Sequence, residues 1–347
     1  MSKILLFSDL HIHMHKNLMS RLEDGLKTVE WIFRTAIEHQ ITKLVFAGDL
    51  FQDRQKIHTI SYEKTFNLIR KFMESYPDLE LYLLVGNHDM WYNNKWDVSS
   101  ISPLEAIRGV TVVNQCKTIE ILPGCPMDFL PYAKNPVEDI KKHFQKKSEI
   151  LISHIAIDEA KLNSFTRSEV SVEYDGDMTK IDVEKFAGWK KVFLGHYHLA
   201  QKLNDVVEYI GSPYELNFGE AFQQKHIIIL NPETLETEYI INDFSPKHLI
   251  IKESQVDSYK LDGNFVQIIV EDITSTDIVD LRHKIVDKNK TASLEFKEQK
   301  KKEEIKDQQK PDFTSGETLE RYVKTKQPPN LDYDKLLKIG KEICQQG

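Results

Sequence analysis

Five short clusters of aspartate, asparagine and histidine lie between residues 9 and 198, and each directly follows an apolar run. The clusters are Asp9 with His11, Asp49 after Gly48, Asn87 with His88 and Asp89 after Gly86, His154, and His196 with His198 after Gly195. Together these side chains offer hard oxygen donors and borderline nitrogen donors, which suit Mn²⁺, Fe²⁺ or Zn²⁺ better than Ca²⁺. One such residue after a strand is usually a helix cap or a surface residue. Five clusters in succession predict a metal site.

The runs that precede the clusters read as short strands, and helices separate the first three of them. Residues 3–7, 44–46 and 81–85 are apolar, whereas apolar side chains recur every three or four residues over 22–37. Wholly apolar strands that alternate with helices indicate a layered α/β domain. From about residue 111 the pattern becomes mainly strands, which predicts a second sheet. Ligands bind at the carboxyl ends of strands in such sheets, so we expect the five clusters to meet there.

Composition sets the broad class of protein. Of the 347 residues, 40% are hydrophobic and 29% are charged, the mix of a globular protein. No apolar run approaches the roughly 20 residues that span a bilayer, so we expect no membrane segment. The N-terminal apolar run is too short for a signal peptide, so we expect a cytoplasmic protein. The net charge of −8 does not indicate a nucleic-acid ligand, but binding depends on local charge, and lysines cluster at 141–147 and 300–302. Cys116, Cys125 and Cys344 suggest neither a disulfide framework nor a zinc-thiolate site.

In their order and context, the five clusters resemble the motifs of calcineurin-like metallophosphoesterases. The resemblance covers roughly residues 1–240 and implies a four-layer α/β sandwich, in which helices flank two mixed sheets. It also implies two divalent metal ions, with Mn²⁺ expected. On this resemblance Asp9, His11 and His198 hold the first ion, Asn87, His154 and His196 hold the second, and Asp49 bridges both. His88 would protonate or stabilise the leaving oxygen of a phosphoester, and Asp89 would orient the His88 ring.

Within that family the closer resemblance is to the SbcD-type nuclease subunit of DNA double-strand-break repair complexes. It rests on the clusters themselves, on Leu50 and Phe51 directly after Asp49, and on the Gly-Ser-Pro sequence at 211–213. It implies four parts: a nuclease domain (1–244), a small α+β cap domain that contacts DNA (245–296), a charged tether (297–313) and a helix–loop–helix segment (314–347) that docks an SMC-like ATPase of the SbcC type. It also implies a homodimer, for which predicted helices at 60–75 and 96–108 are candidate faces. Many members have histidine where this chain has Gln52.

These observations predict a Mn²⁺-dependent DNA nuclease, exonuclease or endonuclease, that acts with an SMC-like ATPase in DNA end processing and recombination repair. Three alternatives remain. A phosphatase or cyclic-nucleotide phosphodiesterase would need neither cap nor docking segment. A phosphoesterase of the polymerase-and-histidinol-phosphatase (PHP) type would use His13 as a ligand, but it would leave the clusters at 86–89 and 195–198 unexplained. A DNA-repair scaffold would keep the metal site for structure alone.

Overall fold

The computed structural model describes residues 2–14, 18–92, 95–157, 160–161, 181–271 and 275–298, together with Lys335 and Lys338. The predicted tether beyond Glu298 and the predicted docking segment at 314–347 lie outside the described residues, apart from those two lysines. The lysines at 300–302 and Cys344 lie outside them as well. The chain divides into two units, and the first, Met1–Glu298, contains every helix and strand considered below. No helix in the described part of the chain is long and apolar enough to cross a membrane.

The first sheet is built around parallel strands that precede three of the five clusters. Its six strands lie in the order β14 (Thr237–Ile241), β13 (His226–Leu230), β1 (Ile4–Phe7), β2 (Lys43–Phe46), β3 (Glu80–Leu84) and β6 (Val110–Val113). The last four run parallel, whereas β13 is antiparallel to β1 and to β14. Parallel neighbours need long crossover connections, and two of these contain α1 (Met19–Glu38) and α2 (Thr59–Ser75). The helix predicted over 22–37 is therefore confirmed.

The second sheet carries the remaining two clusters. Its strands lie in the order β11 (Gln201–Lys202), β12 (Val207–Tyr209), β10 (Lys191–Gly195), β9 (Ile150–His154), β8 (Cys125–Leu130) and β7 (Lys117–Leu122). The four inner strands run parallel, and the two edge strands are antiparallel to their neighbours. The short helix α3 (Pro136–His143) lies between β8 and β9 in the chain. Both sheets are mixed, as expected.

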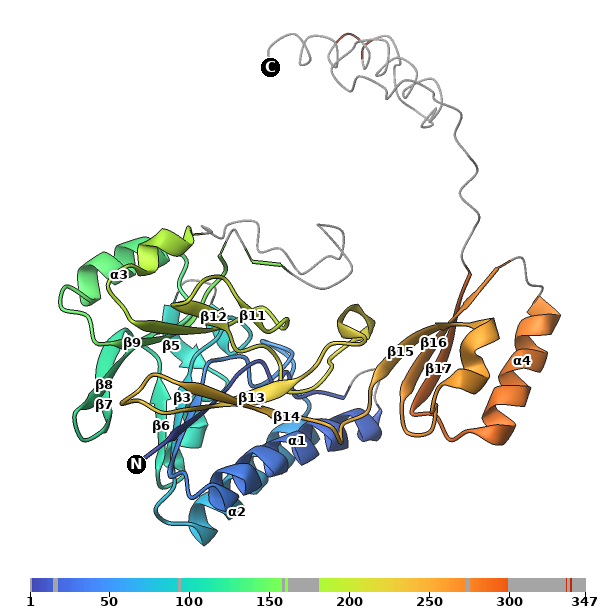
Figure 1. The fold of residues 1–347 in the computed structure, drawn as a ribbon, viewed down its shortest axis with the longest axis horizontal. Helices are drawn as coiled ribbons and strands as arrows, with labels where there is room; N and C mark the ends of the chain where they lie inside the picture. The colour runs from blue at the N-terminus through green and yellow to red at the C-terminus, as the bar shows by residue number, and fades with distance from the viewer. Residues whose placement is uncertain are drawn as a thin grey trace. The chain divides into compact units, whose positions relative to one another are not determined.

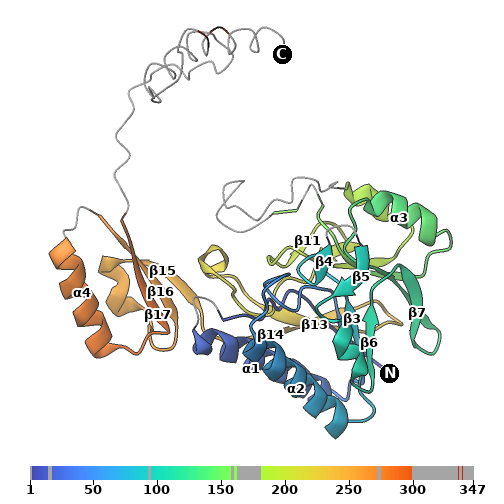
Figure 2. The same ribbon diagram turned by 180° about the vertical axis from the view of Figure 1, so that it is seen from behind.

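Alternation of side chains along the strands divides the core into layers. In β1, Ile4 and Leu6 pack in the core between the two sheets, whereas Leu5 and Phe7 pack on the opposite face with apolar residues of α1 and α2. On the outer face of the second sheet, alternate residues of β9 and β10 pack against α3 and the 3₁₀ helix η3 (Val183–Phe186). The order is therefore helices, sheet, sheet, helices, which is the predicted four-layer sandwich (Figures 1 and 2).

Residues 248–298 have a small core of their own around a three-stranded sheet. The strands β15 (His248–Lys252), β16 (Phe265–Val270) and β17 (Ser293–Glu298) run parallel, and α4 (Ser275–Lys288) lies between the last two in the chain. Val266 on β16 and Ile285 on α4 belong to this core. His248 connects the module to the preceding residues, because its backbone N–H donates to the Glu215 carboxylate at 2.5 Å and its ring lies edge-on to Phe218.

The predicted helix at 96–108 is wrong. Lys95–Ser99 form strand β5, which pairs with β4 (Met90–Tyr92) in a hairpin, and a 3₁₀ helix, η2 (Ser102–Ala106), follows. The hairpin continues beyond the ladder, since the backbone N–H of Ser100 donates to the carbonyl oxygen of Asp89 at 2.8 Å. Pairing with the segment after the third cluster therefore holds this stretch extended, and only a short turn is left for a helix. Of the two candidate dimer faces, α2 alone is a helix.

Candidate metal centre

The five clusters lie at the carboxyl ends of central strands, as predicted. Asp9 and Asp49 follow β1 and β2 within three residues, Asn87 follows β3 in the same way, His154 ends β9, and His196 directly follows β10. The predicted ligands are all buried or half-buried, and Asp9, Asp49 and His154 are at most 1% exposed. Buried polar groups need partners. These side chains must therefore bind one another or a ligand.

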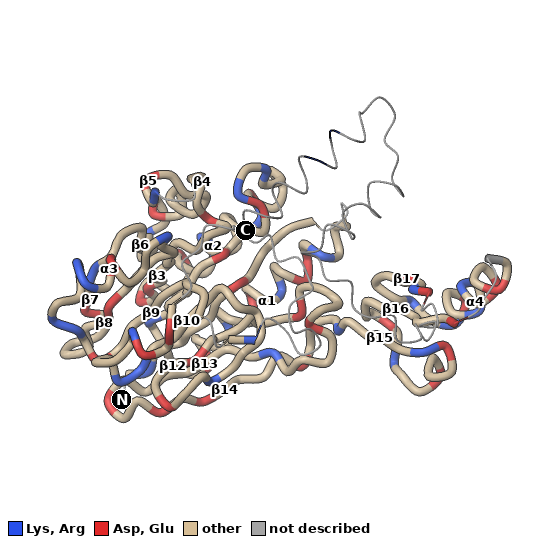
Figure 3. Tube along the Cα trace, turned by 90° about the horizontal axis from the view of Figure 1, so that it is seen from above, with Lys and Arg blue, Asp and Glu red and all other residues tan. Residues whose placement is uncertain are grey.

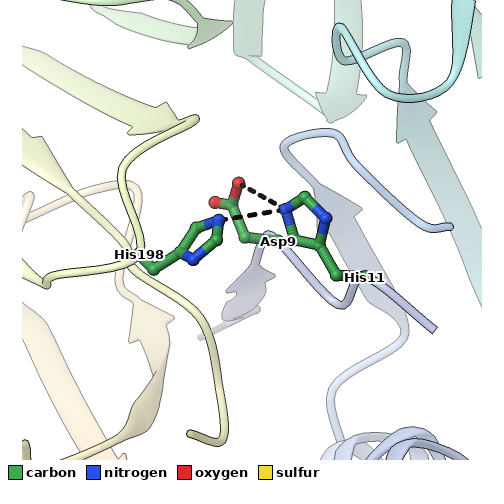
Figure 4. Close-up of side chains that lie close together, drawn as sticks. All are labelled: Asp9, His11 and His198. Carbon is green, nitrogen blue, oxygen red and sulfur yellow. Dashed lines mark hydrogen bonds and ion pairs between the residues drawn. The ribbon is translucent and has the colours of Figure 1, made fainter. Parts of the chain in front are cut away.

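Three of the predicted ligands, Asp9, His11 and His198, direct donor atoms toward one another (Figure 4). The Nε2 atoms of His198 and His11 are 3.0 Å apart, and Nε2 of His11 lies 3.8 Å from Oδ1 of Asp9. Asp9 also accepts the backbone N–H of His196 at 3.0 Å, which ties a loop of the first sheet to a loop of the second. This group contains the three residues predicted to hold the first ion.

Asp49 lies between this group and a second one. Its Oδ2 atom is 3.5 Å from Nε2 of His11 and 3.1 Å from Nε2 of His154. In the second group, Oδ1 of Asn87 lies 2.9 Å from Nε2 of His154 and 3.0 Å from Nδ1 of His196. The structure thus brings all the predicted ligands into one continuous cluster, with Asp49 at the position expected for a bridging carboxylate.

The charges in the cluster compensate one another. Burial alone would raise the pKa of Asp49, but the neighbouring His154 and His88 hold it well below its usual value. Burial alone would lower the pKa of His154, but Asp49 raises it to about 9. Burial and the charge of His154 lower the pKa of His196 to about 3, which leaves the His196 ring neutral. A metal ion bound by His154 would replace the proton on the His154 ring, because imidazole coordinates a metal through a deprotonated ring nitrogen.

The donor atoms fit a divalent cation. Nδ1 of His198 lies 2.8 Å from the Glu220 carboxylate, which only accepts hydrogen bonds, so Nδ1 carries a proton. In the neutral ring the lone pair is then on Nε2, which faces Nε2 of His11. Two imidazole nitrogens that face each other beside the carboxylates of Asp9 and Asp49 form the nitrogen and oxygen donor set that zinc, iron and manganese bind.

Four of the predicted ligands lie on backbone in the left-handed region. The angle φ is 51° at Asp9, 43° at His11, 66° at Asp49 and 96° at His196. Residues other than glycine adopt such angles at a cost of about 1–3 kcal/mol each, and they gather at functional sites. At Gly86 there is no room for a side chain, because a Cβ atom would lie 2.2 Å from Oδ1 of Asp49. The strand ends therefore direct these side chains into the cluster at a cost in stability.

A buried ion pair supports His198 through the ring nitrogen that faces away from the cluster, and the sequence analysis missed it. Glu220 accepts hydrogen bonds from Nδ1 of His198 at 2.8 Å, from Nζ of Lys225 at 2.6 Å and from Oγ of Ser212 at 3.0 Å. Glu220 and Lys225 are 3% and 2% exposed. Burial would raise the pKa of Glu220, but Lys225 and His198 hold it below its usual range. A carboxylate on the outer nitrogen of a ligand histidine fixes its ring and raises its basicity, so Glu220 is a positioning residue.

His88 lies at the edge of the cluster. Its ring centroid is 4.8 Å from that of His11, and its backbone N–H donates to Oδ1 of Asp49 at 2.8 Å. Nδ1 of His88 lies 2.5 Å from the carbonyl oxygen of Gln52 and must donate to it, because a carbonyl only accepts. A backbone group therefore orients the ring, and this contact does not depend on which side chain stands at position 52.

Asp89 does not contact the His88 ring, and the prediction that it orients that ring is wrong. The Asp89 side chain is fully buried and accepts the backbone N–H groups of Gly86 at 2.9 Å, Asp49 at 2.9 Å and Leu50 at 3.0 Å. Burial and the charge of Asp49 raise the pKa of Asp89 to about 7. Because its oxygens join the second and third strand-end loops, Asp89 shapes the backbone that carries the ligands.

The PHP-type alternative requires His13 as a ligand. Nδ1 of His13 lies 2.7 Å from the backbone carbonyl oxygen of His11. Among the described residues, no group of metal-binding side chains includes His13. This arrangement gives the PHP-type alternative no histidine at the position it needs.

Comparison with known proteins gives relatives for most of the described chain. A family model described as Calcineurin-like phosphoesterase matches residues 2–200. The chain is 26% identical over 230 residues to Exonuclease subunit 1 of Enterobacteria phage T4, a match that covers 62% of this chain and 63% of that protein. It is 23% identical over 280 residues to the SbcD subunit of the nuclease SbcCD from Escherichia coli (strain K12), covering 69% of this chain and 67% of that protein. The solved structure of an archaeal phosphodiesterase aligns with a TM-score of 0.36 and 13% identity, over 69% of this chain and 99% of that one. The chain therefore spans less than two thirds of the length of the phage subunit.

Proposed function

The chain belongs to the calcineurin-like phosphoesterase family, and on that basis we propose that it is a Mn²⁺-dependent DNA nuclease, which hydrolyses phosphodiester bonds. The observation that carries this proposal is the pair of Nε2 atoms, from His11 and His198, held 3.0 Å apart beside buried carboxylates. Without a metal ion one of these nitrogens must donate a hydrogen bond to the other, whereas a divalent cation would bind the lone pairs of both. Members of the family use divalent metal ions. Both relatives described above are named as nuclease subunits, which favours DNA as the substrate.

The proposed roles follow the two donor groups. Asp9, His11 and His198 would hold the first ion, Asn87, His154 and His196 would hold the second, and Asp49 would contact both. When bound, two divalent ions neutralise charge on a phosphate and lower the pKa of water. His88 is assigned as the acid that protonates the leaving oxygen, because the Gln52 carbonyl holds one ring nitrogen and the ring lies within 4.8 Å of the donor atoms of His11 and Asp49.

The proposed partners are DNA and an SMC-like ATPase. In this proposal residues 1–244 are the nuclease domain, 245–296 form a cap that contacts DNA, and 314–347 dock the ATPase after the tether at 297–313. Basic and acidic residues intermingle along the described chain (Figure 3), and the net charge is −8, so the ATPase would provide much of the phosphate neutralisation. Lys147 contributes little to it, because its ammonium group packs 4.1 Å from the centroid of the Trp189 ring. We further propose a homodimer through α2 and a cytoplasmic site of action.

The test uses the purified full-length chain with Mn²⁺ and two substrates, linear double-stranded DNA and bis(p-nitrophenyl) phosphate. Asp49→Asn removes the central carboxylate and keeps its size, whereas Asp205→Asn makes the same change at an exposed position. We expect the wild type and Asp205→Asn to hydrolyse both substrates. Asp49→Asn should lose activity by at least about 100-fold on each, because metal charge and its placement dominate this chemistry. Bound Mn²⁺ is measured on the same samples.

Each outcome separates the proposal from an alternative. Hydrolysis of the small diester without cleavage of double- or single-stranded DNA, with and without an SMC-like ATPase, would favour a small-molecule phosphodiesterase over a nuclease. Bound Mn²⁺ without hydrolysis of any substrate would favour the DNA-repair scaffold. Equal activity in Asp49→Asn and the wild type would refute the assigned metal centre itself.

A further inference from the structure

A second group of metal-binding side chains lies at the outer face of the second sheet, where α3 packs near β7 and β8 (Figure 1). Asp139 and His143 are one turn apart on α3, so both side chains lie on the same face of the helix. Cys116 directly precedes β7, the edge strand beside β8. The Cys116 thiol, a carboxylate oxygen of Asp139 and a ring nitrogen of His143 all lie within 4.8 Å of one another.

We propose that Cys116, Asp139 and His143 form a separate site for a single Zn²⁺ or a similar borderline cation. Thiolate, imidazole and carboxylate are the three donor types that zinc takes in proteins. Three protein ligands leave a fourth position for water, which matches the exposed side of His143. This site shares no residue with the phosphoesterase cluster, and that cluster contains no thiol.

The surroundings of these three side chains favour a cation. Burial raises the pKa of the Cys116 thiol to about 12, and the charge of Asp139 adds to this effect. Burial also raises the pKa of Asp139, whose charged neighbours are His143, Lys142 and Glu138. A metal ion that replaces the thiol proton would add positive charge beside this half-buried carboxylate, which His143 and Lys142 already stabilise in part.

The geometry also gives the ion a structural task. Cys116 belongs to the loop before β7, whereas the other two ligands belong to α3. Cys116 and Ile140 contribute to the same apolar cluster, so the loop and the helix are already packed together. An ion held by all three side chains would join α3 to the edge of the second sheet. Its removal would loosen this edge and leave the phosphoesterase ligands in place.

The test is titration of the full-length chain with Co²⁺, followed by absorption spectroscopy. Cobalt bound to a thiolate gives a charge-transfer band in the near ultraviolet, whereas cobalt bound only to carboxylates and imidazoles does not. Because the phosphoesterase cluster has no cysteine, this band reports a thiolate site outside it whether or not the chain is a nuclease, and the variants below assign the cysteine. We expect the band in the wild type, and we expect added Zn²⁺ to abolish it.

Variants identify the ligands. Cys116→Ser should lose the band and one bound ion per chain, whereas Cys125→Ser, which changes another half-buried cysteine of the second sheet, should keep both. His143→Ala should also lose one ion, and far-ultraviolet circular dichroism without metal checks that each variant is folded. A band that persists in Cys116→Ser, or no band in the wild type at a several-fold excess of Co²⁺, would overturn the proposal.

Discussion

The buried pair of Glu220 and Lys225 predicts that Glu220→Gln weakens metal binding at a ligand that it does not replace. The glutamine keeps the length of the side chain but loses the charge that fixes the His198 ring. Five groups donate to Glu220: Nδ1 of His198, Nζ of Lys225, Oγ of Ser212, the backbone N–H of Leu216 and Nδ2 of Asn217. An amide has a single acceptor atom, so its NH₂ group must face at least one of these former donors. The His198 ring is then free to rotate or to change tautomer.

The expected magnitudes follow from burial and partners. Loss of the carboxylate behind a ligand histidine lowers metal affinity or activity about 10- to 100-fold. Lys225 is 2% exposed and would keep its charge without a counterion, which costs about 3–5 kcal/mol of unfolding free energy. Lys225→Met added to Glu220→Gln removes that buried charge. We expect the double variant to regain most of the stability and none of the metal affinity, because Glu220 holds the His198 ring, whereas Lys225 donates only to the backbone carbonyl of His198, at 3.1 Å.

The assay separates the two effects. Mn²⁺ affinity is measured by calorimetric titration into metal-free protein, and stability is measured by urea unfolding in the presence of a chelator. Glu233→Gln, at an exposed turn, is the matched control and should change neither quantity. Unchanged Mn²⁺ affinity in Glu220→Gln, or full recovery of affinity in the double variant, would refute the role of Glu220 in positioning His198.

Three further predictions concern other parts of the molecule. His88→Gln should lower kcat about 10²- to 10⁴-fold with bound metal unchanged, which steady-state kinetics and metal analysis would check; a loss of bound metal would make His88 a ligand instead. The Asp128 carboxylate accepts the Nε1–H of buried Trp189 at 2.8 Å, and Asp128→Ala leaves that donor without an acceptor. Urea unfolding of this variant should show a free energy of unfolding lower by about 1–3 kcal/mol, with kcat unchanged. Burial raises the pKa of Asp24 to about 6 despite the opposing charge of Arg21, so its contribution to stability is present below about pH 4 and is lost as the pH rises toward 6. Over that window the unfolding free energy of the wild type should fall by up to about 3 kcal/mol relative to Asp24→Asn, and parallel pH profiles would contradict this.

The parts of the fold that the sequence predicted are those that local pattern determines. The run Ile4–Phe7 is apolar at every position because both faces of β1 are covered, and that is visible without knowing what covers them. The strand ends were equally visible, since polar residues replace apolar ones at Asp9 and Asp49. Convergence of these ends then follows from the parallel arrangement of the strands.

The parts that the sequence did not predict depend on pairing between distant segments. Glu220 and Lys225 look like ordinary loop charges, and their burial appears only once β13 and the segment at 211–213 are in place. Asp89 was assigned to its sequence neighbour His88, but its oxygens face a loop that lies forty residues earlier in the chain. The helix at 96–108 was expected from the family resemblance alone, and the pairing of 95–99 with β4 makes that stretch a strand instead.

The same kind of pairing explains why the cysteines were judged ordinary. A thiol far in sequence from any other metal-binding residue shows no ligand spacing, and only the packing of α3 against the second sheet brings Asp139 and His143 near Cys116. The contact between the loop before β7 and α3 forms only on folding, so the sequence could not indicate it. Sequence spacing detects ligands that are neighbours in the chain, and it fails for ligands that become neighbours on folding.

The left-handed backbone at four predicted ligands has a consequence for laboratory evolution. Glycine adopts these angles without the strain that aspartate and histidine incur, and it also removes a buried charge at Asp9 or Asp49. A selection for thermal stability alone would therefore enrich glycine at these positions and yield thermostable but inactive variants. Any screen for a more thermostable form of this protein must therefore measure turnover in the same step, because substitutions that raise stability at these positions also remove metal ligands.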